Sequence, residues 1–222
     1  MSTGNGKNGK LPEMKIVLSG LDNSGKTSML RVIDKIYEFI GEIDSLKPTV
    51  RIEYSTIRFI NFLISVFDMG GQEKYRKAYL NREVYFDNVD RFIYLIDIKD
   101  PDRFDESIDY LEKVLEIFRT NEYNKNVPIF ICFTKMDYEK VFDSDRSEYL
   151  KRLASVRKKI QEVASDFKFD FFSTSIYNIY SIIKMISMAI HDFFTGYKNL
   201  MEFLMDFSEE HEIDQLILFD NT

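Results

Sequence analysis

The sequence is poor in the residues that build disulfides and metal sites. Its 222 residues include one cysteine, two histidines, four prolines and no tryptophan. The single cysteine, Cys132, excludes an intrachain disulfide, and its apolar neighbours indicate a small buried side chain. Neither His191 nor His211 has a metal-ligand partner at helical spacing. Because the chain also lacks a signal peptide, we expect an intracellular, cytoplasmic protein.

Long apolar runs and excess positive charge are absent as well. No run reaches the roughly 18 apolar residues that a membrane-spanning helix needs. Residue 2 is a serine, which excludes the myristoylation pattern, and the chain ends without a prenylation box. The net charge of −7 argues against binding nucleic acid through a basic surface. We therefore expect no nucleic-acid partner, and membrane contact only through another protein.

The chain is organised around one glycine-rich stretch, GLDNSGKT, which runs from Gly20 to Thr27. It has the G-x-x-x-x-G-K-T pattern of a phosphate-binding loop. An apolar run at 14–18 predicts a buried strand before it, and a helical pattern at 30–40 follows it. Glycines let the backbone wrap closely around phosphate, and free N–H groups at a helix N-terminus point at the anion. The predicted nucleotide-binding residues here are Gly20, Asp22, Asn23, Ser24, Gly25, Lys26, Thr27 and Ser28.

A second box, DMGGQ from Asp68 to Gln72, ends a predicted strand. The carboxyl ends of strands are where an α/β fold places ligand chemistry. Asp68 and the hydroxyl of Thr27 are predicted to hold Mg²⁺. The Gly71 N–H is predicted to bond a terminal phosphate, and Gln72 is the predicted catalytic residue because it can orient an attacking water.

A third box, Thr134-Lys135-Met136-Asp137, follows a predicted buried strand and resembles the N-K-x-D box of small GTPases. The resemblance implies that Asp137 accepts hydrogen bonds from guanine and that the Lys135 stem packs over the ring. Thr134 stands where asparagine, which often braces the phosphate loop, is usual. The later stretch with Ser175 and Ile176 resembles the small-GTPase loop whose backbone contacts guanine O6.

The order of apolar segments predicts an α/β fold, and the resemblance of the boxes implies that it is the P-loop NTPase fold of small GTPases. We expect a mostly parallel six-stranded sheet with helices on both faces. One long helix is predicted at 148–167 after a loop at 138–147, and its inward residues are predicted to be Leu150, Leu153, Val156, Ile160 and Val163. Residues 1–12 are predicted to be a disordered leader, 13–195 a GTPase domain and 196–222 a C-terminal extension.

Together, these boxes resemble a small GTPase of the Ras superfamily. GLD in the phosphate loop and DMGGQ are similar to the Arf-like branch, although the chain has Phe67 where that branch usually has tryptophan. Three other fragments are similar to motifs of the Rag/Gtr branch: GKTSM, the x-K-M-D box without asparagine, and TSI. Residues 200–219 resemble the opening of the roadblock-type domain of Rag/Gtr proteins. We therefore expect that the chain is a shortened form, or that its tail docks on the GTPase domain or on a second subunit; a frayed extension is the alternative.

The resemblance implies a switch that binds GTP or GDP with Mg²⁺ and hydrolyses GTP slowly. Thr49 would help to hold the metal and would be released after hydrolysis, and effector, GTPase-activating and exchange proteins would be its partners. Arg51, Arg58 and Arg76 are near the predicted site but are expected at the surface, so a partner would supply acceleration. One alternative is a non-hydrolysing, nucleotide-bound scaffold subunit of a heterodimer. A weaker alternative, a small-molecule kinase, would leave Thr134–Asp137 unexplained.

Overall fold

The computed structural model describes most of the predicted GTPase domain. The described residues are 13–38, 52–59, 62–137, 143–191 and 207. Residues 1–183 form one compact unit and residues 184–222 a second. Thr49, the leader and nearly all of the extension lie outside the described residues, so their predicted roles remain predictions.

Six strands form one sheet in the order β2-β3-β1-β4-β5-β6. The strands are β1 (Glu13–Gly20), β2 (Ile52–Phe59), β3 (Phe62–Met69), β4 (Arg91–Asp97), β5 (Ile129–Thr134) and β6 (Phe169–Ser173). Only the β2–β3 pair is antiparallel; the other four pairings are parallel. The predicted mostly parallel six-stranded sheet is therefore confirmed, and the carboxyl ends of β1, β3, β4, β5 and β6 meet at one edge.

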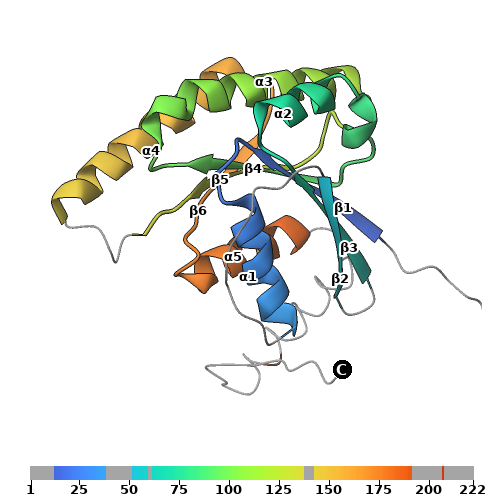
Figure 1. The fold of residues 1–222 in the computed structure, drawn as a ribbon, viewed down its shortest axis with the longest axis horizontal. Helices are drawn as coiled ribbons and strands as arrows, with labels where there is room; N and C mark the ends of the chain where they lie inside the picture. Colours follow the sequence, from blue (N-terminus) through green and yellow to red (C-terminus); the bar gives the residue numbers. More distant parts are fainter. Residues whose placement is uncertain (1–12, 39–51, 60–61, 138–142, 192–206, 208–222) are drawn as a thin grey trace, which may run out of the picture. The chain divides into compact units, whose positions relative to one another are not determined.

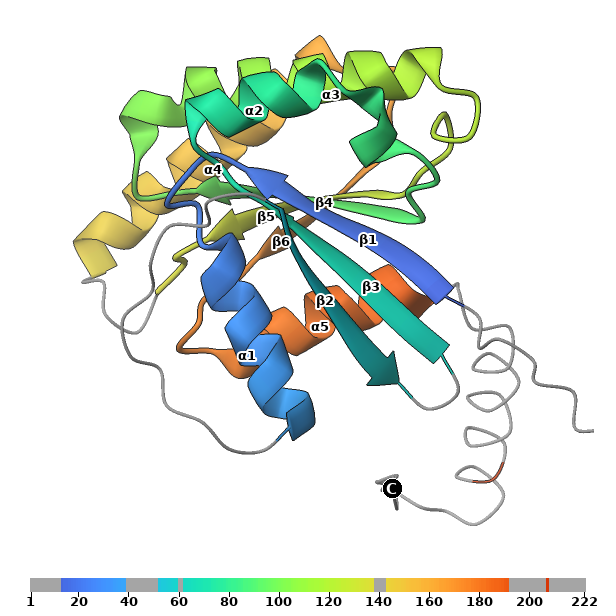
Figure 2. The ribbon, with the colours of Figure 1, turned by 45° about the vertical axis from the view of Figure 1, so that its right-hand side comes forward.

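Helices cover both faces of the sheet, as predicted. The helical elements are α1 (Lys26–Glu38), α2 (Glu73–Leu80), η1 (Glu83–Phe86), η2 (Pro101–Arg103), α3 (Phe104–Thr120), α4 (Asp143–Val163) and α5 (Ile179–His191). Figures 1 and 2 show α2, α3 and α4 on one face and α1 on the other. The first turn of α5 belongs to the same unit as the sheet, and its Ile182 lines a cavity together with Met29 of α1.

The core lies between the central strands and α3. Every residue of β5 is buried, as are six of the seven residues of β4. Phe92 of β4 and Phe118 of α3 pack edge to face with ring centroids 5.1 Å apart, an arrangement that aromatic quadrupoles favour. Cys132 of β5 is fully buried, and burial raises the pKa of its thiol to about 12. Its sulfur lies 3.1 Å from the hydroxyl oxygen of Thr174.

The helix α4 differs from its prediction in extent and in burial. It begins at Asp143, inside the segment predicted as a loop. Val156 and Ile160 are buried, but Leu150 is 52% exposed and Val163 37% exposed. Tyr149 and Leu153 also pack against the core, so the buried stripe runs along most of the helix but is narrower than the apolar stripe of the sequence. Leu150 and Val163 lie at its sides. Among the described residues, no helix is long and apolar enough to cross a membrane.

Candidate nucleotide site

The phosphate-binding loop adopts a conformation that its glycines make accessible. Gly20 and Gly25 have φ angles of 141° and 91°, and Asn23 has a φ of 62°. A Cβ on Gly20 would lie 2.4 Å from the carbonyl oxygen of Leu95, so no larger residue fits there. The loop leads directly into α1, whose N-terminal N–H groups favour an anion.

Lys26, at the start of α1, is folded into this loop. Its side-chain nitrogen donates to the carbonyl oxygens of Gly20 at 3.0 Å and Leu21 at 2.6 Å. Burial lowers the pKa of Lys26 to about 8, although the carboxylates of Asp68 and Asp22 oppose that shift. An ammonium in so dry a place interacts strongly with any phosphate that the loop holds.

Two of the three predicted metal ligands, Thr27 in the first turn of α1 and Asp68 near the end of β3, lie together. The hydroxyl of Thr27 donates to a carboxylate oxygen of Asp68 at 2.7 Å, and Asp68 is fully buried. Two oxygens in adjacent positions of an octahedral Mg²⁺ shell lie about 3 Å apart, because each is about 2.1 Å from the ion. Both groups are hard oxygen donors at close to that separation, so they fit Mg²⁺. In the described part of the chain no three His, Cys, Asp or Glu residues gather into a metal centre.

The DMGGQ box lies against the phosphate loop. The N–H of Asp22 donates to the carbonyl oxygen of Gly71 at 3.0 Å. A Cβ on Gly71 would lie 2.1 Å from the Asp22 nitrogen, so glycine is needed for this approach. Gln72 follows as the N-cap residue of α2 and is partly exposed. The structure thus places Gln72, the predicted catalytic residue, directly after the glycine that contacts the phosphate loop.

A cavity of about 150 Å³ adjoins the phosphate loop at the third box. It is lined by Gly25, Ser28, Met29, Thr134, Lys135, Asp137, Thr174, Ile176, Tyr177 and Ile182. One carboxylate oxygen of Asp137 accepts from the Ser175 hydroxyl at 2.5 Å, and the other accepts from Lys99 at 2.6 Å. These bonds fix the orientation of the Asp137 carboxylate beside the cavity.

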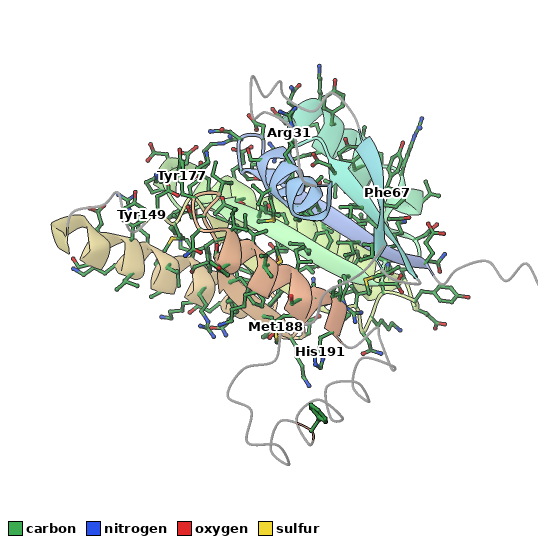
Figure 3. All side chains as sticks on the ribbon, turned by 90° about the horizontal axis from the view of Figure 1, so that it is seen from below. Arg31, Phe67, Tyr149, Tyr177, Met188 and His191 are labelled. Carbon is green, nitrogen blue, oxygen red and sulfur yellow. The ribbon has the colours of Figure 1, made fainter. Side chains whose placement is uncertain are left out.

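Lys135 of this box and the later stretch around Ser175 are also held by hydrogen bonds. Lys135 has a φ of 60°, and its side-chain nitrogen lies 2.6 Å from a carboxylate oxygen of Asp97. The N–H of Ser175 donates to the Ser181 hydroxyl at 3.1 Å. Tyr177, labelled in Figure 3, lies in the loop before α5 and is 62% exposed at the cavity.

Thr134 joins the two halves of the site. Its hydroxyl oxygen lies 2.8 Å from the carbonyl oxygen of Ser24 and 3.2 Å from that of Ile96. A hydroxyl has one proton, so it donates to these carbonyls in turn or in a shared bond. Thr134 therefore connects the strand that carries the base box with the phosphate loop.

Several residues at the site were not predicted from the sequence. Asp97 and Lys99 come from the end of β4, and Arg103 reaches the loop from η2, with a nitrogen 2.7 Å from a carboxylate oxygen of Asp22. Asp97 and Lys99 lie at the carboxyl end of a central strand, which is the signal that could have identified them, whereas Arg103 lies farther along the chain and has no such signal. Arg76 was expected at the surface, but it is only 7% exposed, so that expectation was wrong. Arg51 and the side chain of Arg58 lie outside the described residues.

Solved structures with a similar fold include a small GTPase and a translation elongation factor. The Arl6 (BBS3) small GTPase of Trypanosoma brucei, solved with the nucleotide analogue GppNp, matches with a TM-score of 0.61 and 24% identity over 81% of this chain and 96% of that one. Translation elongation factor SelB of Methanococcus maripaludis, solved with the GTP analogue GppNHp, matches with a TM-score of 0.57 and 18% identity over 83% of this chain and 34% of that one. At these identities the likeness establishes the fold.

The fold and its nucleotide loops define a small GTPase. Within that class, the conserved region of the Gtr1/RagA G proteins matches residues 15–222. The chain therefore belongs to the Gtr1/RagA G protein family. The predicted combination of Rag/Gtr-like and Arf-like features is confirmed, since the family match and the likeness to Arl6 both appear.

Proposed function

We propose that this protein is a guanine-nucleotide switch that hydrolyses GTP slowly in the presence of Mg²⁺. The observation that carries the proposal is the bond from the Asp22 N–H to the Gly71 carbonyl, because it puts Gln72 beside the phosphate loop. The cavity with Asp137 and Lys135 adjoins the same loop. A base-reading pocket and a water-orienting residue therefore flank one phosphate site.

The chemistry assigned to these residues is transfer of the terminal phosphoryl group to water. Gln72 would orient the water, whose oxygen forms a bond to the γ-phosphorus as the bond to the bridging oxygen breaks. The products are GDP, inorganic phosphate and one proton. Lys26 would offset charge on the phosphate oxygens, and Thr27 and Asp68 would hold the metal. Mg²⁺, when bound, would add a further positive charge against the same oxygens.

Unaided turnover is expected to be slow, on the order of 10⁻⁴ to 10⁻² s⁻¹. Arg76 is the one arginine candidate whose side chain the structure describes, and it bonds Glu106 and lies over the ring of Tyr110. It is thus engaged away from the phosphates, so a GTPase-activating partner would supply the acceleration. Effector and exchange proteins would read the DMGGQ loop and the segment around Thr49. The 196–222 extension would dock on this chain or on a second copy or subunit.

The test is to identify the nucleotide that co-purifies with the protein and then to measure single-turnover GTP hydrolysis. Wild-type protein should turn over GTP slowly, and Gln72→Leu should reduce the rate at least tenfold while GTP affinity stays within about threefold. The exposed Lys77→Ala on α2 is a matched control and should behave as wild type. Bound GTP that persists in the wild type, with no effect of Gln72→Leu, would instead favour the scaffold subunit.

A further inference from the structure

The phosphate-binding loop carries an acid at its centre. Asp22 lies between the loop's two glycines, Gly20 and Gly25. A carboxylate in a loop that binds phosphate repels its ligand unless another group offsets its charge. The structure supplies that group from a different part of the chain.

Arg103 holds Asp22 by both its side chain and its backbone. One guanidinium nitrogen lies 2.7 Å from the Asp22 carboxylate, and the other lies 3.3 Å from its carbonyl oxygen. Burial raises the pKa of Asp22, but the hydrogen bond and charge of Arg103 more than compensate, so this pKa lies below its usual value. Asp22 is therefore a carboxylate that depends on Arg103.

Arg103 is in turn held by Glu106 and, through it, tied to α2. Its Nε donates to a carboxylate oxygen of Glu106 at 2.9 Å. The other oxygen of Glu106 accepts from Arg76 of α2. Arg76 is buried, with its guanidinium 5.1 Å from the ring centroid of Tyr110, so it has little room to move away alone.

We infer that Arg103 is a positioning residue that neutralises Asp22 at the phosphate loop, and that Glu106 and Arg76 link this neutralisation to helix α2. The inference rests on the proposed function, since it concerns the same phosphate site. Removing Arg103 leaves Asp22 to repel the phosphates. The repulsion grows with phosphate charge, so it acts more strongly on GTP than on GDP.

The link to α2 follows from the same charges. Glu106 lies between two arginines, and each offsets part of its charge. When Arg76 is absent, Glu106 interacts more strongly with the positive charge of Arg103. Arg103 then offsets less of the negative charge of Asp22. A movement of α2, the helix that begins directly after Gln72, therefore changes how well Asp22 is neutralised at the phosphate loop. This effect needs no contact between α2 and the nucleotide.

The experiment measures the dissociation constants of GTP and GDP with the full chain, using Asp22→Asn, Arg103→Gln and the double variant. Arg103→Gln should weaken GTP at least tenfold and GDP by about threefold or less. Asp22→Asn in the same chain should restore both to within about threefold of wild type. Arg119→Gln is the matched control: Arg119 is on α3, the helix that follows Arg103, and pairs with Asp166, at 2.7 Å. It should leave both affinities unchanged.

The outcomes separate this inference from the proposed function. Wild-type protein that binds no GTP overturns both before any variant is compared. If the wild type binds GTP, two results would overturn the role of Arg103. One is that Arg103→Gln lowers the affinities for GTP and GDP equally, and the other is that adding Asp22→Asn does not restore the lost affinity. If Arg103→Gln alone does not fold, the double variant decides: it lacks the uncompensated charge and should fold and bind GTP, and its failure to do so overturns the inference.

Arg76→Gln tests the link to α2. It should weaken GTP by about threefold to fivefold in the wild-type background and have no effect in the Asp22→Asn background. An equal effect in both backgrounds would show that Arg76 acts through packing and would overturn the link.

Discussion

The hydroxyl of Thr134 lies 2.8 Å from the carbonyl oxygen of Ser24, so the end of β5 is bonded directly to the phosphate loop. Asparagine is usual at this position in small GTPases, and the shorter side chain still reaches the loop. The bond connects the box proposed to read the base with the box proposed to bind phosphate. The predictions below concern substitutions at this bond and at other contacts within the proposed site.

Replacing Thr134 with valine keeps its shape and removes this bond. A buried carbonyl without its donor costs about 1–3 kcal/mol, so we expect GTP and GDP to weaken together by roughly tenfold. Nucleotide dissociation rates measure this. Thr174→Val is the matched control, because Thr174 is buried nearby but its hydroxyl faces the sulfur of Cys132. Equal effects of the two variants would contradict a specific brace.

Asp137→Asn should change which base the cavity accepts. The carboxylate is the acceptor for guanine's N–H donors, and an amide can offer a donor to the C2 carbonyl of xanthine. We expect GTP affinity to fall at least 100-fold and XTP affinity to rise. Competition between the two nucleotides gives the answer. Unchanged preference for GTP would mean that Asp137 does not contact the base.

Thr27→Ala should weaken the link between Mg²⁺ and nucleotide. The Thr27 hydroxyl and the Asp68 carboxylate form the oxygen pair that fits the ion. In the wild type, chelation of Mg²⁺ should speed GDP release at least tenfold, and in Thr27→Ala release should be fast with or without chelator. Ser65→Ala, which removes another buried hydroxyl from β3, should retain the wild-type response.

Gly71→Ala should slow hydrolysis through sterics alone. The added Cβ would lie 2.1 Å from the Asp22 nitrogen, so the DMGGQ loop must move away from the phosphate loop. Single-turnover hydrolysis should fall about as far as in Gln72→Leu, with GDP affinity close to wild type. Hydrolysis at the wild-type rate would show that this approach is not needed for catalysis.

Local sequence was sufficient for the parts of the site that lie in continuous boxes. The phosphate loop could be predicted because its glycines and Lys26 act through adjacent backbone, and the strand before it is continuously apolar. Arg103 could not, because its partner Asp22 is 81 residues away and a surface arginine in a helical pattern has no distinctive neighbours. The same holds for Arg76, whose burial comes from Tyr110 and Glu106 on another helix.

The error in α4 has a different cause. Its apolar residues Leu150 and Val163 follow the helical period, but periodicity reports only which face could be buried. How wide a stripe is buried depends on how the helix is rotated about its axis: Tyr149, Leu153 and Ile160 pack in the core, while Leu150 and Val163, beside that line, stay exposed. Sequence does not specify this rotation, so the width of the buried stripe is difficult to predict.

Because Cys132 is buried, the rate at which a thiol reagent modifies it reports how often this part of the protein opens. The thiol is in a strand paired on both sides, and its raised pKa leaves almost no thiolate at neutral pH. A thiol reagent can therefore modify the protein only when the side chains that cover Cys132 move away and expose its sulfur. Because Thr134 and Asp137, which follow Cys132 in the chain, line the proposed nucleotide cavity, a bound nucleotide should slow that modification by a factor that grows with its concentration relative to its dissociation constant. One unmodified side chain thus offers a ligand-binding assay that needs no label on protein or nucleotide.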